Sequence, residues 1–133
     1  MAGNESDDPP LSKDGRAEYD RLRFSKSYII GADECGYGSW AGPLVVCAAA
    51  VPKDWRPPQD LNDSKKLRPT TRDRLFEYLR SRVPYACAMA QSDEIDRHGI
   101  ILALRRCYRE TVEAVLTRFP DSLVVLDGEV RLP

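Results

Sequence analysis

The sequence has little of several features that would assign a protein to a particular class. It contains one histidine, which excludes a histidine-rich zinc site. No apolar run approaches the roughly 18 residues of a membrane span, and the polar, acidic N-terminus lacks the apolar core of a secretory signal. The net charge of −1 argues against a surface covered with positive charge for nonspecific nucleic-acid binding. We therefore expect a cytoplasmic protein in which any basic surface is local.

The four cysteines are widely spaced and form no CxxC pair. Three of them stand in apolar runs, which is typical of buried free thiols in a reducing compartment. A disulfide framework or a zinc site would require closer or paired spacing. The sequence therefore predicts free thiols at Cys35, Cys47, Cys87 and Cys107.

The length of 133 residues suits one domain with its own hydrophobic core. Residues 1–26 are polar and contain Pro9-Pro10, which predicts a flexible N-terminal tail with a short helix around Ala17–Phe24. The folded domain is expected over residues 27–133, and the sequence has no internal repeats.

Apolar runs and helical periodicity alternate along this domain. Buried strands are predicted at four apolar runs, Tyr28–Ala32, Leu44–Val51, Tyr85–Ala90 and Leu123–Leu126. One helix is predicted from Arg68-Pro69, with apolar positions at Leu75, Phe76, Leu79 and Val83. A second helical stretch is predicted from Ser92, with an apolar stripe from Ile100 to Leu116. Strands with intervening helices predict a mixed α/β domain.

Three carboxylates follow predicted strands and precede glycines: Asp33, Glu34 and Asp127. Strand ends beside small residues are where α/β proteins hold charged groups open to a ligand. Converging carboxylates repel one another, and a bound cation removes that repulsion. Their hard oxygen atoms favour Mg²⁺ or Mn²⁺ over zinc. The alternative is that each acid caps a turn, and the residues alone leave both interpretations open.

Two polar segments are candidates for contacts with a phosphate or a sugar. The glycine-rich segment from Gly36-Tyr37-Gly38 to Gly42-Pro43 can bring backbone amides close to such a ligand. The segment Asn62–Lys66 is polar and basic, with Arg68 nearby. Considered singly, a turn and a solvated loop explain them as well.

Four blocks of this sequence share the order of one known family. The first is Gly31–Gly38 followed by Ala41–Val46, the second Leu61–Leu67, the third Glu94–Arg97, and the fourth Val124–Gly128. Together they resemble the ribonuclease HII family of type 2 ribonucleases H, over about 100 residues. The resemblance implies an α/β fold with a ribonuclease H-like mixed sheet and flanking helices.

The resemblance also implies the chemistry. Members hydrolyse the RNA strand of RNA–DNA hybrids, or ribonucleotides embedded in duplex DNA, by two-metal-ion catalysis that leaves 5′-phosphate and 3′-hydroxyl ends. The family binds its Mg²⁺ or Mn²⁺ ions with four acids. The matching positions here, which are both the catalytic and the metal-binding candidates, are Asp33, Glu34 and Asp127.

Substrate contacts are implied in the same way. The glycine loop would read the ribose 2′-hydroxyl, which distinguishes RNA from DNA, through Gly36, Tyr37 and Gly38. Lys65 would hold a phosphate near the cut, and Lys66 would follow the nucleic-acid backbone. The expected role is in DNA replication and repair.

The sequence departs from the family in three places. The family's fourth acid lies beyond the last strand, in sequence that this chain does not contain, so we expect a domain truncated at its C-terminus. Tyr37 stands where the family usually has arginine, and the loop around it also resembles ribonuclease HIII. Gly99 replaces a common asparagine and is expected to weaken the helix locally.

These departures leave a second hypothesis open. The chain would then be an inactive fragment or a noncatalytic module that binds RNA–DNA hybrids or forms a complex. A complementing C-terminal segment is an expected partner; otherwise we expect a monomer that does not bind membranes. Metal-dependent cutting distinguishes the two hypotheses.

Overall fold

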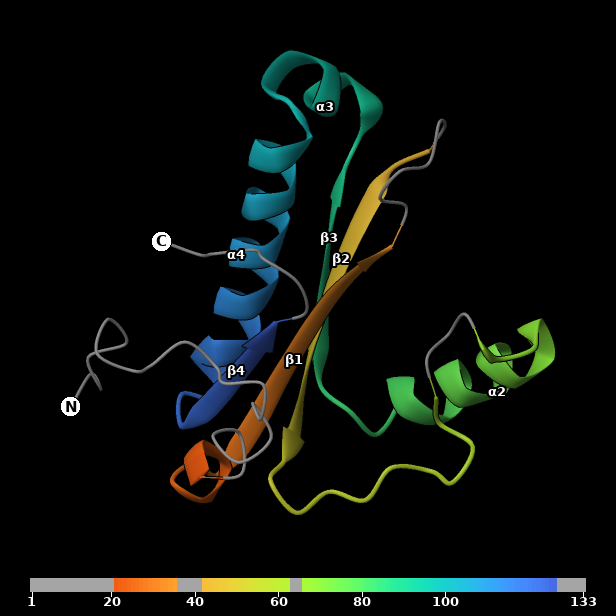
Figure 1. Ribbon diagram of the computed structural model, residues 1–133, viewed down its shortest axis with the longest axis vertical. Helices are drawn as coiled ribbons and strands as arrows, with labels where there is room; N and C mark the ends of the chain where they lie inside the picture. The colour runs from red at the N-terminus through yellow and green to blue at the C-terminus, as the bar shows by residue number, and fades with distance from the viewer. Residues whose placement is uncertain (1–20, 36–41, 63–65, 127–133) are drawn as a thin grey trace.

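The computed structural model in Figure 1 describes residues 21–35, 42–62 and 66–126. Its strands and helices are β1 (Tyr28–Cys35), β2 (Leu44–Pro52), α2 (Pro69–Arg80), β3 (Tyr85–Ala90), α3 (Ser92–His98), α4 (Ile100–Arg118) and β4 (Ser122–Leu126). All four predicted strands are confirmed, and the α/β class with them. No helix in the described part of the chain is long and apolar enough to span a membrane.

The four strands form one mixed sheet in the order β3-β2-β1-β4. β1 pairs antiparallel with β2, and β2 pairs antiparallel with β3. β4 returns parallel to β1, and their last described pair is Ala32 with Leu126. Because β1 and β4 are parallel, their carboxyl ends lie at the same edge of the sheet. We call this the carboxyl edge of β1 and β4.

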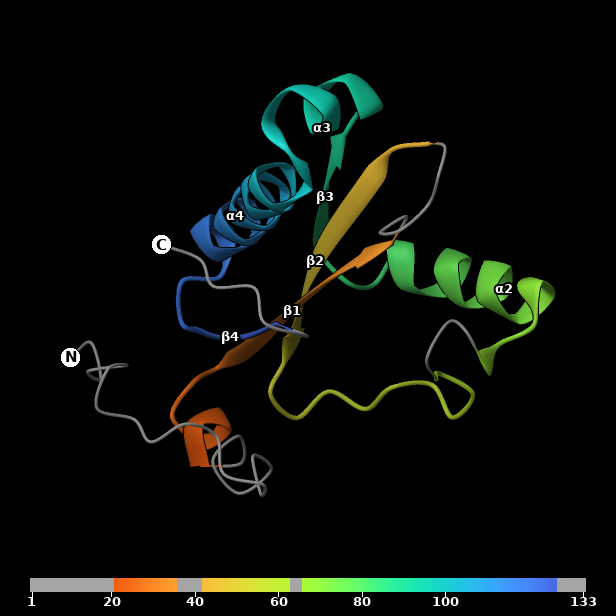
Figure 2. The same ribbon diagram turned by 45° about the horizontal axis from the view of Figure 1, so that its top comes forward.

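One face of the sheet is covered by α4, as Figures 1 and 2 show. Successive side chains of a strand point to opposite faces, so alternate residues of each strand meet this helix. The core between sheet and helix is formed by Ile30, Ala32, Leu44, Val46, Ala48, Ala50, Ala90, Ala103, Leu104, Cys107, Tyr108, Val112 and Val115. The predicted apolar stripe on α4 therefore faces the sheet.

The opposite face of the sheet, which we call the open face, is much more exposed. The side chains of Tyr85, Met89 and Val125 point to it and keep 46, 48 and 38% of their surface exposed. Figure 2 shows α2 on this side of the sheet, away from α4. The described part of the domain thus has one covered face and one open face.

The helices differ from the sequence prediction at two points. Helix α2 begins at Pro69 as predicted but ends at Arg80, and Phe76 is exposed instead of packed. The stretch from Ser92 forms two helices, because Gly99 between them has a φ of +83°. That value lies in the left-handed region, which glycine adopts without steric cost. Gly99 thus ends one helix and begins the next.

Candidate active site

Asp33 and Glu34 lie near the carboxyl end of β1, but not beyond it. The prediction that they follow the strand is wrong, because pairing with β2 continues to Cys35. As neighbours in a strand, the two acids point to opposite faces. Asp33 is exposed on the open face, and Glu34 is half-buried on the face that α4 covers. The strand therefore presents two carboxylates in different environments.

A local hydrogen bond orients the first of these acids. Asp33 Oδ1 accepts a hydrogen bond from the backbone N–H of Glu34 at 2.9 Å. In the sheet, Asp33 stands opposite Cys47 of β2. The carboxylate is therefore accessible from solvent on the open face and beside the second strand.

A tertiary contact orients the second acid. The hydroxyl of Tyr108 on α4 donates a hydrogen bond to Glu34 Oε2. Tyr108 is fully buried in the core between α4 and the sheet. Glu34 is thus bonded to the covering helix, whereas Asp33 accepts its hydrogen bond from its own strand.

The prediction of four free thiols is wrong for two cysteines. Cys47 and Cys87 stand directly opposite each other on β2 and β3, with their Cα atoms 4.2 Å apart, and form a disulfide. Cys35 is free but exposed. Cys107 is free and buried as predicted, and burial raises the pKa of its thiol. The disulfide lies on the open face beside Asp33, because Cys47 is the pairing partner of both Asp33 and Cys87.

The donor chemistry at the carboxyl edge fits a hard divalent cation. Carboxylate oxygens are the ligands that Mg²⁺ and Mn²⁺ prefer. Among the described residues no group of three or more metal-ligating side chains occurs. Two of the predicted ligands, Asp33 and Glu34, lie among these residues. The third predicted ligand, Asp127, directly follows Leu126 in the sequence and lies outside the described residues.

Most of the predicted substrate-binding residues also lie outside the described part of the chain. These are Gly36, Tyr37, Gly38 and Lys65. The described neighbour Lys66 is exposed. Gly42, at the end of the glycine-rich segment, has a φ of +104°, a conformation that favours glycine.

Sequence reasoning gave no role to Arg106. The guanidinium of Arg106 donates to both carboxylate oxygens of Glu94, each at 2.6 Å, and to Glu110 at 2.9 Å. It also donates to the backbone oxygen of Met89 at 2.8 Å. These bonds lower the pKa of Glu94 and raise that of Arg106. Arg106 therefore joins α3, α4 and the end of β3.

One signal for Arg106 was present in the sequence. Arg106 and Glu110 are four residues apart, which places them on one face of a helix. The contact of Arg106 with Glu94 depends on the turn at Gly99 between α3 and α4, and no local pattern predicts that turn angle. Spacing alone therefore predicts the ion pair of Arg106 with Glu110 but not the one with Glu94.

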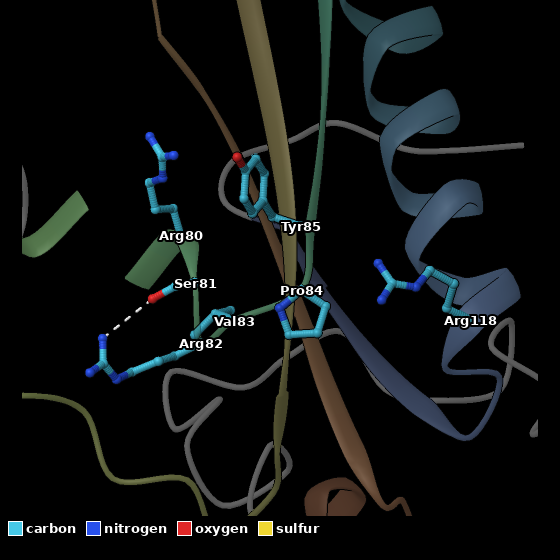
Figure 3. A pocket seen from close by; sticks show the side chains of 7 residues that line it. All are labelled: Arg80, Ser81, Arg82, Val83, Pro84, Tyr85 and Arg118. Carbon is cyan, nitrogen blue, oxygen red and sulfur yellow. Dashed lines mark hydrogen bonds between the residues drawn. The ribbon is translucent and has the colours of Figure 1, made fainter. Parts of the chain in front are cut away.

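A separate pocket of about 320 Å³ lies at the start of β3, and Figure 3 shows it. Its lining consists of Arg80, Ser81, Arg82, Val83, Pro84, Tyr85 and Arg118. Arg82 donates a hydrogen bond to the backbone oxygen of Tyr78 at 2.9 Å. The Cζ atom of its guanidinium lies over the aromatic ring of Tyr78, 3.9 Å from the ring centre. The lining contains neither Asp33 nor Glu34, so the candidate site lies outside this pocket, with Asp33 exposed on the open face.

Comparison with known proteins agrees with the family resemblance of the sequence. The profile of the family described as Ribonuclease HII matches residues 30–119. A Ribonuclease HII of Streptomyces avermitilis is 46% identical over 110 residues, which cover 82% of this chain and 46% of that protein. A Ribonuclease HII of Ehrlichia ruminantium is 36% identical over 110 residues, which cover 81% of this chain and 52% of that protein. The chain spans about half the length of these relatives.

Solved structures support the same fold. A mutant of Bst-RNase HIII is similar with a TM-score of 0.60 and 25% identity, covering 83% of this chain and 40% of that one. Bst-RNase HIII solved in complex with Mn²⁺ gives a TM-score of 0.60 at 24% identity, with the same coverage. The mixed sheet with its flanking helices is thus ribonuclease H-like. The profile match over residues 30–119, together with the identity to the two relatives, shows that this chain belongs to the ribonuclease HII family.

Proposed function

We propose that this chain carries the carboxylates of a divalent-metal-dependent ribonuclease H site that cuts RNA hybridised to DNA or embedded in it. The observation that carries the proposal is the placement of Asp33 and Glu34 at the carboxyl edge of β1 and β4. The family membership supports the reaction class, since the relatives are named as ribonucleases.

The proposed ligands of the divalent ions are Asp33, Glu34 and Asp127. Asp127 directly follows Leu126 in the sequence, and Leu126 is the last described residue that pairs with β1. Bst-RNase HIII, which shares the fold, was solved with Mn²⁺, and this supports Mg²⁺ or Mn²⁺ as cofactor. Such ions supply an activated hydroxide and stabilise the negative charge that develops on the phosphate.

The chain's own residues would bind and orient the nucleic acid. We propose that the segment containing Gly36, Tyr37 and Gly38 contacts the ribose 2′-hydroxyl, because glycines permit a close backbone approach. Lys65 and Lys66 would hold phosphates, since a lysine ammonium attracts the backbone charge. The products would carry 5′-phosphate and 3′-hydroxyl ends.

An open site suits a macromolecular substrate. Asp33 is exposed on the open face, and the described pocket at the start of β3 lies elsewhere. A duplex cannot enter a pocket of about 320 Å³, but it can lie against an exposed sheet edge. We propose that the enzyme acts in the cytoplasm, in DNA replication and repair.

The test is incision of labelled duplexes by the purified chain. One substrate carries a single ribonucleotide in duplex DNA, and the other is an RNA–DNA hybrid. We expect cutting with Mg²⁺ or Mn²⁺ and none with chelator. Asp33→Asn should lower the rate on the order of 100-fold or more, because losing a metal ligand removes several kcal/mol of transition-state stabilisation.

The control variant is Glu113→Gln, which removes an exposed carboxylate near the end of α4. It should cut like the unmodified chain. Binding of the duplex without cutting, by a chain that unfolds cooperatively, would contradict the nuclease proposal. That result would support a noncatalytic hybrid-binding module, and adding a C-terminal segment of a relative would test complementation.

A further inference from the structure

We infer that Tyr108 is a positioning residue for the metal site, acting through Glu34. This inference rests on the proposed function, because it assigns Glu34 to the binding of a divalent ion. The observation that carries it is a hydrogen bond between two distant segments. The Tyr108 hydroxyl on α4 donates to Glu34 Oε2 on β1, across 74 positions of the sequence.

The burial of the two partners indicates which residue restrains the other. Tyr108 is completely buried, so its ring is fixed by the core residues around it. Glu34 is half-buried near the end of a strand, and its side chain has three rotatable bonds. A rigid donor therefore restrains a flexible acceptor. The carboxylate of Glu34 loses most of its freedom before any ion arrives.

The bond leaves Glu34 able to bind a cation. A carboxylate offers about four lone-pair sites on its two oxygens, and the tyrosine hydroxyl occupies a site on Oε2. A neutral hydroxyl also adds no charge that would compete with an ion. Residues that hold metal ligands by hydrogen bonds in this way commonly raise the affinity for the ion.

The two neighbouring acids show why Glu34 in particular needs such a partner. Asp33 has a short side chain, and the backbone N–H of Glu34 orients it within the same strand. Glu34 is longer and faces the opposite side of β1. Without a fixed partner its carboxylate would sample positions along α4. Tyr108 restricts that sampling to one place.

The alternative is that Glu34 only stabilises the core, by accepting a hydrogen bond from the buried hydroxyl of Tyr108. The two roles differ in what they predict for metal binding. If the hydrogen bond only stabilises the core, then removing the hydroxyl changes the stability of the fold and leaves the metal affinity unchanged. If Tyr108 positions Glu34, then metal affinity falls while the fold persists.

The experiment measures Mn²⁺ binding to the full chain by the electron paramagnetic resonance signal of free Mn²⁺, without nucleic acid. Tyr108→Phe keeps the ring and removes the hydroxyl. We expect it to raise the apparent Kd for Mn²⁺ about tenfold or more, as loss of a ligand's hydrogen-bond partner commonly does. Incision activity should recover at high Mn²⁺ concentration, since the variant lacks affinity and not a reacting group.

Thr111→Val is the matched control. Thr111 is also buried on α4, and its hydroxyl donates to the backbone oxygens of Cys107 and Tyr108. Its loss removes a core hydroxyl without touching Glu34, so Mn²⁺ affinity should not change. Thermal melts of both variants verify that the fold is retained and compare the loss of stability caused by removing each hydroxyl.

Glu34→Gln completes the design. It should weaken Mn²⁺ binding, and adding Tyr108→Phe to it should weaken binding no further, because the tyrosine acts through the carboxylate. Unchanged affinity in Tyr108→Phe would overturn the inference and leave the nuclease proposal standing. Unchanged affinity in Glu34→Gln would overturn the inference and remove Glu34 from the proposed ligands. An unmodified chain that binds no Mn²⁺ would overturn both.

Discussion

On the face of the sheet that α4 covers, Ile30 and Val46 have no solvent exposure, whereas Tyr85 and Met89 on the open face are nearly half exposed. Both faces belong to the same strands, so the difference comes from what lies against them. The covered face is held by close packing. The open face instead carries a disulfide across β2 and β3. The candidate carboxylates divide between these environments, with Glu34 restrained by the core and Asp33 left accessible.

The strongest test of this contrast compares two adjacent isoleucines. Ile30 faces α4 and is fully buried, while its neighbour Ile29 faces the open side and is half-buried. Ile30→Ala should lower the free energy of unfolding by about 2 to 5 kcal/mol, because it leaves a cavity in a packed core. Ile29→Ala should lower it by about 1 kcal/mol, because less apolar area is lost. Urea denaturation measures both.

The two substitutions control for each other, since each removes the same atoms from the same strand. Equal losses would mean that the open face is covered in solution, by another part of the protein or by a second molecule. The contrast between the faces would then be wrong.

A smaller effect is expected from breaking the disulfide on the open face. Cys47 and Cys87 are 40 residues apart in sequence, so their bond restricts a long loop in the unfolded chain. Reduction should lower the free energy of unfolding by about 2 to 4 kcal/mol. Melting with and without reductant measures the loss, and the Cys47→Ser/Cys87→Ser double variant should not respond to reductant. If the melting of the unmodified chain is also unaffected by reductant, the disulfide does not form in solution.

The smallest effect is a pH dependence at the end of the covered face. The hydrogen bond from Arg106 lowers the pKa of Glu94 below its ordinary 4.5. A lowered pKa stabilises the fold fully above pH 4.5, and this contribution is lost as the pH falls through the lowered value. Glu94→Gln should therefore reduce Tm by a few degrees at pH 7, and the difference should close as the pH falls well below 4.5. Glu113→Gln, an exposed change on α4, should show no such trend; a constant difference for Glu94→Gln would refute the mechanism.

The sequence was sufficient for features that depend on local pattern. Short apolar runs predicted all four strands, and the stripe from Ile100 to Leu116 predicted which face of α4 is buried. Both patterns follow from the periods of strand and helix, which need no knowledge of the rest of the chain. The end of β1 was predicted at Ala32 and lies at Cys35, three residues later, so Asp33 and Glu34 stand in the last part of the strand.

Features that depend on register and on turn angles could not be predicted in this way. The disulfide requires Cys47 and Cys87 to be direct cross-strand partners, and a shift of one residue would place them on opposite faces. The sequence could not distinguish Tyr108 from the other positions of the apolar stripe. Its hydroxyl forms a hydrogen bond with Glu34 only when β1 and α4 pack together. Arg106 reaches Glu94 only because Gly99 turns the chain between two helices.

The parallel pairing of β4 with β1 has a consequence for the order of folding. Ser27 and Asp121, which join the starts of these strands, are 94 residues apart, whereas β1 and β2 are consecutive strands. Closing the longer loop costs more chain entropy and is slower than closing the short one. The antiparallel pairs β1–β2 and β2–β3 should therefore form first. The carboxyl edge of β1 and β4 is completed later, when β4 returns to pair with β1.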